Sequence, residues 1–243
     1  GNGSVIAICG EAGAGKSRMV HEFKSSLQDR PIRWYSAYAH DYARNCSYAL
    51  LRDLLNSMLH IGEGHSVDVI RQKIERTYRF TTEESTPLAA CLERLYGADS
   101  REAAAADPEI WKSRLHDAMR VLLKRETQHM PTVFFLEDIH WADPSSLESI
   151  KTFGDFNCPA LFIYTFRPAA HVLPGLHGFA EGLTCRQINL TGLSAEESRQ
   201  LLESLLKPHA VPPALERFIL AKADGNPLYL EEMLNNLIES ASL

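Results

Sequence analysis

A glycine-rich segment near the start of the chain has residue types that can hold a chain of phosphates. Residues 10–17, Gly-Glu-Ala-Gly-Ala-Gly-Lys-Ser, match the pattern G-x-x-x-x-G-K-[ST] in full. Glycines let the backbone curl so that successive N–H groups point at phosphate oxygens, and the N-terminus of a following helix favours anions. The pattern therefore predicts a nucleoside triphosphate site, with Lys16 on the β- and γ-phosphates and the Ser17 hydroxyl on Mg²⁺. The residues assigned to the nucleotide in this segment are Gly10, Glu11, Ala12, Gly13, Ala14, Gly15, Lys16, Ser17 and Arg18.

Two carboxylates follow an apolar run later in the chain. The run 132–136 ends in Glu137 and Asp138, and carboxylate oxygens are ligands that suit Mg²⁺. One carboxylate is expected to hold Mg²⁺, and the other to orient or deprotonate the attacking water. Adjacent strand residues point to opposite sides, so we expect the two to differ in role. The competing interpretation is an acidic pair at a strand end with no role in chemistry.

A threonine and an arginine close a further apolar run. Thr165 lies in the run 160–166 and Arg167 follows it. Both would lie beside the γ-phosphate if the sheet places this strand next to the first, and they could then sense whether that phosphate is present. The alternative for Arg167 is an ordinary exposed arginine. The sequence contains no N-K-x-D motif to read guanine, which favours adenine, and hence ATP.

Apolar runs alternate with segments of helical periodicity along most of the chain. The strands and helices that they predict must position the glycine loop, the acidic pair and Arg167. Continuous β-branched and aromatic runs predict strands, and 3.6-residue periods predict helices. Strands alternating with helices indicate an α/β fold with a parallel, doubly wound sheet and helices on both faces. Ligands of such sheets bind at the carboxyl ends of the strands, where the glycine loop and the acidic pair are expected. The predicted strands are 4–9, 32–39, 132–138, 160–166 and 185–190, and the predicted helices of the middle region are 47–60, 67–79, 86–97 and 108–129.

The character of the sequence changes after residue 190, where only helices are predicted. Ser194 and Glu197 have the spacing of a capping box at the start of the first of them. We expect a core of residues 1–190, with a helical insertion at about 47–129, and a second, partial helical domain of residues 191–243.

Composition excludes several classes of protein. The chain has 243 residues, of which 45% are hydrophobic, so a buried core is expected. Its formal net charge of -6 disfavours non-specific binding to nucleic acid or to an anionic membrane. Five cysteines without C-x-x-C spacing favour a reducing compartment, the cytoplasm, over disulfides or zinc. No apolar run suits a membrane helix, and a start without Met leads us to expect a fragment of a longer protein.

Several motifs together resemble the signalling ATPases of the AAA+-like STAND class, which are modules of multidomain bacterial transcription regulators, nucleotide cyclases and kinases. They are the glycine loop, "LEDIHWADPSSLE", "YTFRP", "LTGLSAEES" and "GNPLYLEEM", in the family's order over nearly the whole chain. The resemblance implies a P-loop NTPase with a five-stranded sheet, the glycine-loop strand near its centre, and a C-terminal helical lid.

The resemblance also assigns a residue of the lid and marks departures. Pro227 matches the proline of the family's G-x-P turn, which packs near the base and ribose; it also suits a helix start capped by Asn226. The family usually has Asp where Glu137 stands. Its adenine-holding segment before the first strand and its modules after the lid are missing from this sequence.

Three functions compete on this basis. The first is a regulatory switch that binds ATP with Mg²⁺, hydrolyses it slowly and passes the nucleotide state to other domains of the same protein. The second is a ring-forming AAA+ remodelling ATPase, which needs an arginine from a neighbouring subunit. No Arg or Lys lies between Pro168 and Cys185, and Arg186 is the nearest candidate. The third is a small-molecule kinase, which the scattered cations of the last helices do not favour.

The sequence favours the switch. Its expected partners are ATP and ADP, the other domains of the full-length protein and, depending on nucleotide, further copies of itself. A sensor that binds but does not hydrolyse remains an alternative. Arg71, Lys73, Arg76 and Arg79 crowd one predicted helix, but a charge run usually forms a solvated face, so direct nucleic-acid binding is disfavoured.

Overall fold

The computed structural model describes residues 3–62, 64–78, 91, 94–96, 107–153, 158–168, 184–206 and 212–241. Most of the helix predicted at 86–97, and Arg79 of the basic helix, lie outside these residues. The strands are β1 (Ser4–Gly10), β2 (Arg33–Tyr38), β3 (Thr132–Glu137), β4 (Ala160–Phe166) and β5 (Thr184–Leu190). The helices are α1 (Lys16–Ser26), α2 (Ala49–Leu59), α3 (Val67–Tyr78), α6 (Pro108–Thr127), α7 (Pro144–Lys151), α9 (Ala195–Leu206), α10 (Pro213–Ala223) and α11 (Pro227–Ala241), with short 3-10 turns η1 (Asp41–Ala43) and η2 (Ile139–Trp141).

The five strands form one parallel sheet in the order β2-β3-β4-β1-β5. The α/β fold class is thereby confirmed, and each predicted strand coincides with an observed one. The register pairs Tyr38 with Glu137 and Leu136 with Tyr164, so β2, β3 and β4 end at the same edge of the sheet. β4 lies next to β1 in this order, which is the condition that the prediction for Thr165 and Arg167 required.

The chain divides into two compact units by its internal contacts. The first consists of residues 1–7 and 27–187, and the second of residues 8–26 and 188–243. Within the parts of both units that the structure describes, no helix is long and apolar enough to cross a membrane.

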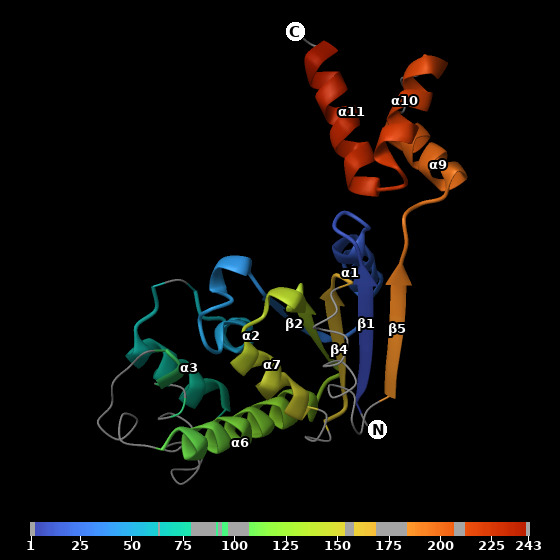
Figure 1. The fold of residues 1–243 in the computed structure, drawn as a ribbon. Coiled ribbons are helices and arrows are strands. Elements are labelled where there is room, and N and C mark those ends of the chain that lie inside the picture. Colours follow the sequence, from blue (N-terminus) through green and yellow to red (C-terminus); the bar gives the residue numbers. More distant parts are fainter. Residues whose placement is uncertain are drawn as a thin grey trace. The chain divides into compact units, whose positions relative to one another are not determined.

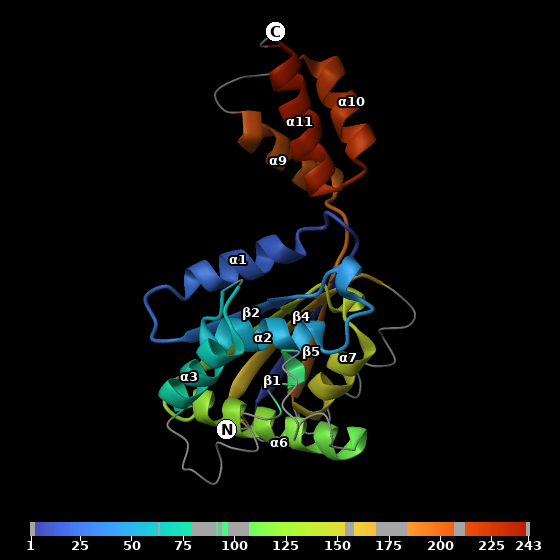
Figure 2. The same ribbon diagram turned by 90° about the vertical axis from the view of Figure 1, so that its left-hand side faces the viewer.

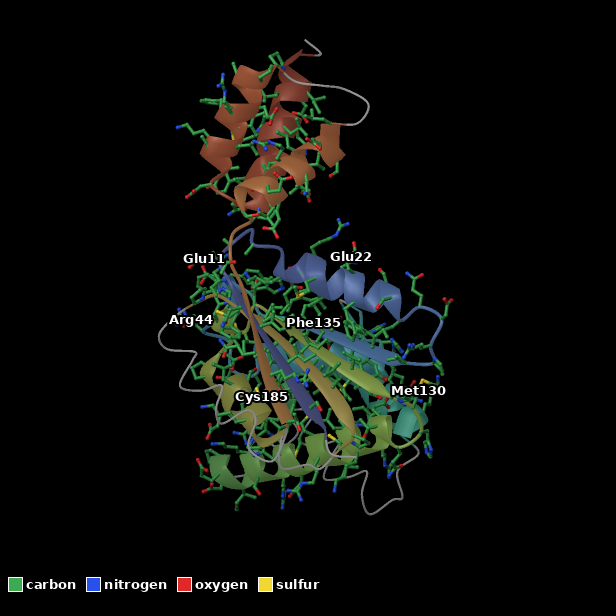
Figure 3. The ribbon with its side chains drawn as sticks, turned by 90° about the vertical axis from the view of Figure 1, so that its right-hand side faces the viewer. Glu11, Glu22, Arg44, Met130, Phe135 and Cys185 are labelled. Atoms are coloured by element: carbon green, nitrogen blue, oxygen red, sulfur yellow. The ribbon has the colours of Figure 1, made fainter. Side chains whose placement is uncertain are left out.

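In the first unit, α2 packs on β2 and against α7, and Figure 2 shows both helices in front of the sheet. The core on this side is a row of rings: Phe134 stacks on Tyr35 at 5.6 Å and on Phe162 at 5.3 Å between centroids. Phe135, the next residue along β3, lies on the opposite face, which Figure 3 shows. Strand alternation thus puts one large ring on each side of the sheet, and both are buried.

Two helices of this unit show how local sequence sets their packing and start. The apolar stripe of α6 buries Leu115, Ala118 and Leu122, while Trp111 of the same stripe is half-buried. Asp143 caps α7, since its Oδ1 accepts a hydrogen bond from the Ser146 N–H at 2.9 Å, and Pro144 occupies the first position of the helix.

In the second unit, α9, α10 and α11 pack around a small apolar cluster (Figure 1). Leu202, Ile219 and Leu230 are its most deeply buried members. The capping box at the start of α9 is present: the Ser194 N–H donates to Glu197 Oε2 at 2.8 Å, and the Glu197 N–H donates to Ser194 Oγ at 3.2 Å.

Candidate functional site

The glycine loop joins β1 to α1 within the second unit, as predicted. The strand ends at Gly10, Glu11 (labelled in Figure 3) follows it, the chain turns at residues 12–15, and α1 begins at Lys16. Gly13 has φ +78° and Gly15 has φ +93°, values that L side chains rarely adopt. The sequence needs glycine at these two positions because the loop curls there. We call residues 10–17 the phosphate loop.

Lys16 is the residue around which this loop closes. Its side chain is only 8% exposed, and its ammonium donates to the carbonyl oxygens of Gly10 and Glu11, both at 2.9 Å. A buried ammonium requires such acceptors, because an unpaired charge away from water costs several kcal/mol (about 3 or more). The loop backbone therefore holds the cation at the start of the helix, where the N–H groups of α1 also favour an anion.

The other residues assigned to the nucleotide differ in their surroundings. Ser17 and Arg18 are exposed, and Arg18 forms an ion pair with Glu22 at 2.7 Å on the surface of α1. Cys9 is buried at the end of β1, as expected of a small apolar residue. Burial raises the pKa of its thiol, while nearby Lys16 lowers it and Glu11 raises it.

Asn226 connects the last helix of this unit to the phosphate loop, a contact that the sequence did not predict. Its Oδ1 caps α11, accepting from the N–H groups of Leu228 at 3.1 Å and Tyr229 at 3.4 Å. Its Nδ2 donates to the Ala12 carbonyl at 2.9 Å. A Cβ on Gly13 would lie 2.4 Å from Asn226 Oδ1, so only glycine allows this approach. The G-N-P turn is the sequence signal; Pro227 is half-buried beside Asn226.

The acidic pair lies in the first unit, at the end of β3. Glu137 is the last residue of the strand and is half-buried. Asp138 has left the strand: its φ of 54° and ψ of 41° are left-handed. The prediction from strand alternation is therefore wrong at this position, because a left-handed residue does not continue the pleat. The two carboxylates still differ, but the turn, not the pleat, sets the direction of Asp138.

The turn at Asp138 is held by a buried threonine of the neighbouring strand. The Asp138 N–H donates to Thr165 Oγ1 at 2.9 Å, and Thr165 is fully buried. On its other side, Asp138 Oδ1 lies 3.8 Å from Nδ1 of the buried His140. Thr165 therefore holds the backbone of an acidic residue from within the sheet, a role that its place in the sequence did not indicate.

Arg167 is half-buried after β4, so it is not an ordinary exposed arginine. Its guanidinium carbon lies 6.0 Å from the centre of the Trp141 ring, at the outer limit of a cation–π contact. We call the carboxyl ends of β3 and β4, with Glu137, Asp138, Thr165 and Arg167, the acidic edge.

Comparison with known proteins identifies the family. The profile of the AAA ATPase domain family matches residues 1–156. The chain belongs to this family. The match takes in β1 and the phosphate loop as well as β3 and the acidic pair, so nucleotide binding is implied for this AAA ATPase domain.

This AAA ATPase domain is similar to known proteins and solved structures. An uncharacterized protein of Rhizobium meliloti (strain 1021) is 24% identical over 242 residues, which are 96% of this chain and 22% of that protein. The chain therefore spans about a fifth of the length of this relative.

The Orc1 protein of Aeropyrum pernix, solved in complex with DNA, matches 98% of this chain and 55% of its own with a TM-score of 0.58 and 14% identity. The Cdc6p structure from Pyrobaculum aerophilum matches 90% of this chain and 48% of its own with a TM-score of 0.46 and 12% identity. The similarity to the Orc1 structure supports the AAA ATPase fold alone.

The residues of this AAA ATPase domain fit MgATP by their chemistry. The phosphate loop offers backbone N–H groups, the ammonium of Lys16 and the Ser17 hydroxyl, which suit phosphate and Mg²⁺. The acidic edge offers the half-buried carboxylates of Glu137 and Asp138, whose oxygens suit Mg²⁺ and its water shell. Among the residues that the structure describes, no group of three or more His, Cys, Asp or Glu forms a separate metal cluster.

Proposed function

We propose that this AAA ATPase domain is a switch of the STAND class within a longer protein, which binds MgATP and hydrolyses it slowly. The observation that carries the proposal is the hydrogen bond from Asn226 to the Ala12 carbonyl. It makes the first turn of α11 part of the wall of the phosphate loop. A ligand that rearranges the loop therefore changes the contact of the lid, which is what a nucleotide switch requires.

Each candidate residue has a role in this proposal. Lys16 leaves its two carbonyl partners for the β- and γ-phosphates, while Ser17 and one carboxylate hold Mg²⁺, which neutralises charge on the phosphates. We assign to the half-buried Glu137, at the end of the strand, the role of orienting the attacking water. We assign to Asp138 the role of binding Mg²⁺ or the water molecules around it. Arg167 senses the γ-phosphate, and Pro227 packs near the base and ribose.

Slow hydrolysis follows from the arginine content of the sequence. Residues 169–184 include no Arg or Lys, so the arginine that neighbouring subunits of a ring motor supply is not evident. Such a residue contributes about 10³–10⁵ to the rate where it is present. The switch is therefore favoured over the remodelling ring, and the domains that read it are expected in the rest of a protein that is longer than this chain.

A nucleic-acid function has less support. The Orc1 protein of Aeropyrum pernix was solved in complex with DNA, but at 14% identity the likeness carries the fold alone. In this chain Arg71 of α3 pairs with Asp68 at 3.6 Å, and the net charge is -6. A helix that neutralises part of its own positive charge is expected to bind the phosphate backbone of nucleic acid weakly.

The test measures MgATP binding and phosphate release side by side for the wild-type protein and for Lys16→Ala. We expect micromolar binding and slow release in the wild type, and loss of both in the variant. Lys24→Ala, at the exposed end of the same helix, is the matched control and should change neither. Fast release that rises steeply with protein concentration would favour the ring, and a wild type that binds no nucleotide would overturn the proposal.

A further inference from the structure

A cavity lies at the end of β2, entirely within the first unit. Its volume is about 330 Å³, the lower end of the range typical of small-molecule sites, about 300–1,000 Å³. Its walls come from the segment after β2, from one face of α2 and from the residues that follow the acidic pair. We call it the edge pocket; the residues that decide its chemistry are His40, Tyr42, Arg52, Asp53, Asn56 and Trp141.

One side of the edge pocket is aromatic. His40 and Tyr42 stack at 5.0 Å with their planes 11° apart. Tyr42 is 84% exposed although it is a large ring, and the partly exposed Trp141 lines the cavity from η2. Water-exposed rings that line one cavity form a surface on which a flat ring can stack.

The other side is a cluster of polar groups on α2. Asp53 Oδ2 accepts from the Tyr38 N–H at 2.8 Å, which fixes the carboxylate and leaves Oδ1 to accept from a ligand. Asn56 Oδ1 accepts from the Tyr96 hydroxyl at 2.7 Å, which fixes the amide. Arg52 comes one residue before Asp53 and lines the same cavity.

The charges of Arg52 and Asp53 both act on the neighbouring phenol of Tyr96. Burial raises the pKa of the Tyr96 phenol, Arg52 lowers it and Asp53 raises it. A guanidinium and a fixed carboxylate thus both act on one half-buried hydroxyl. A guanidinium suits a carboxylate in a bidentate pair, and a fixed carboxylate suits an ammonium.

We propose that the edge pocket binds a small zwitterion with an aromatic ring, the chemical class of the aromatic amino acids. The ring stacks on Trp141 and the His40–Tyr42 pair, the ligand carboxylate pairs with Arg52, and its ammonium donates to Asp53. Opposite charges on adjacent residues of α2 that both line the cavity, next to rings, match opposite charges next to a ring in the ligand. The pocket shares no residue with the phosphate loop, so binding of this ligand does not require nucleotide.

The position of the pocket gives such a ligand a route to the acidic edge. The Ala39 N–H, on the pocket wall, donates to the Glu137 carbonyl at 3.0 Å. Trp141 also lies under the guanidinium of Arg167. This coupling, unlike binding itself, rests on the proposed function.

The experiment is calorimetric titration of the whole protein with L-tryptophan, L-tyrosine and L-phenylalanine. At least one should bind with a Kd below about 1 mM. Three analogues of phenylalanine divide the ligand into its parts: 3-phenylpropionate lacks the ammonium, phenethylamine lacks the carboxylate, and L-alanine lacks the ring. Each should bind at least about tenfold more weakly than the parent.

Variants assign those parts to residues. Arg52→Met should weaken binding of the amino acid about tenfold or more and leave the affinity for phenethylamine unchanged. Asp53→Asn should weaken binding of the amino acid equally and leave the affinity for 3-phenylpropionate unchanged. Tyr42→Ala tests the ring surface at an exposed position where the fold is not at risk. Arg44→Met and Tyr229→Ala, exposed residues outside the cavity, are the matched controls.

The outcomes separate this proposal from the function proposed above. Binding that persists in Lys16→Ala protein supports a site apart from the nucleotide. The edge-pocket proposal is overturned if none of the three amino acids binds below about 1 mM, or if Arg52→Met and Tyr42→Ala bind them as the wild type does. Neither result depends on whether MgATP binds.

Discussion

The phosphate loop and the acidic edge are built in different ways. The loop is formed by consecutive residues, and its lysine is held by carbonyls five and six residues away. The acidic edge is assembled from two strands: a carboxylate that ends β3, a turn residue, and a threonine 27 positions later that holds that turn. A site made of one segment depends on backbone geometry, whereas a site made across strands depends on register.

The difference shows which changes each region tolerates. In the phosphate loop, backbone N–H and C=O groups make most of the contacts, so side chains other than Lys16 and Ser17 matter mainly through the space they need. In the proposed function each side chain of the acidic edge has its own task, so a conservative substitution there should remove one function and leave the others.

The largest expected effect is at the acidic edge. Glu137→Gln should reduce phosphate release by about 10²-fold or more with little change in ATP affinity, because a water-orienting carboxylate acts in the chemical step. Asp138→Asn should instead make ATP binding insensitive to Mg²⁺. Release rates and ATP affinities measured with Mg²⁺ and with EDTA distinguish the two. The reverse pattern would exchange the roles assigned to the two residues.

A smaller effect is expected where space is the issue, at Gly13. The Cβ of an alanine there would lie 2.4 Å from Asn226 Oδ1, and the residue would have to keep a φ of +78°. An L residue with this left-handed backbone conformation costs about 1–2 kcal/mol. Gly13→Ala should therefore lower both thermal stability and ATP affinity. Gly64→Ala is the control, because Gly64 has φ +83° and an added Cβ there meets nothing within 4 Å.

A double-mutant cycle isolates the contact itself. Adding Asn226→Gly to Gly13→Ala removes the 2.4 Å contact but leaves the strain and the contact with Leu228 Cβ at 3.0 Å, so the double variant should recover part of the lost affinity. Strict additivity of the two changes would mean that Asn226 and the loop act independently. The Asn226–Ala12 hydrogen bond would then no longer support the switch proposal.

Much of the fold and part of the site could be predicted from the sequence, for reasons visible in particular residues. Buried parallel strands have continuous apolar runs, so the runs ending at Gly10, Glu137 and Phe166 predict strands with small errors in their bounds. The cap at Asp143 and the phosphate loop are local patterns whose partners lie within a few residues. Local patterns predict well because they do not depend on how distant segments meet.

The features that the sequence did not predict all join distant parts of the chain. Asn226 reaches Ala12 across 214 positions, and no periodicity reports such a pairing. The apolar residues before Asp138 predict that it continues a strand, whereas its left-handed turn is held by Thr165 on another strand. The edge pocket likewise combines a segment after β2 with residues around 141, which only the parallel register brings together.

Arg167 offers an intermediate test of the acidic edge. Arg167→Lys keeps a cation but weakens its contact with the Trp141 ring, which is worth about 0.5–2 kcal/mol. We expect ATP hydrolysis to slow by about two- to thirtyfold on that basis, with ADP affinity unchanged, since ADP lacks the γ-phosphate. Equal losses for ATP and ADP would indicate a structural role instead. Arg186→Lys, the nearest cation beyond the acidic edge, is the control.

The smallest expected effect lies in the capping box of α9, where a local pattern has a local consequence. The Ser194 N–H, and then its hydroxyl, lower the pKa of Glu197. A carboxylate whose pKa is lower in the folded protein contributes stability at neutral pH, and this is lost as the pH falls from about 4.3 through the folded pKa. Glu197→Gln should therefore lower the melting temperature slightly at pH 7 and not at pH 3. Glu203→Gln, exposed on the same helix, should show no such dependence. If both variants respond alike, the general charge of α9, and not the cap, sets its stability.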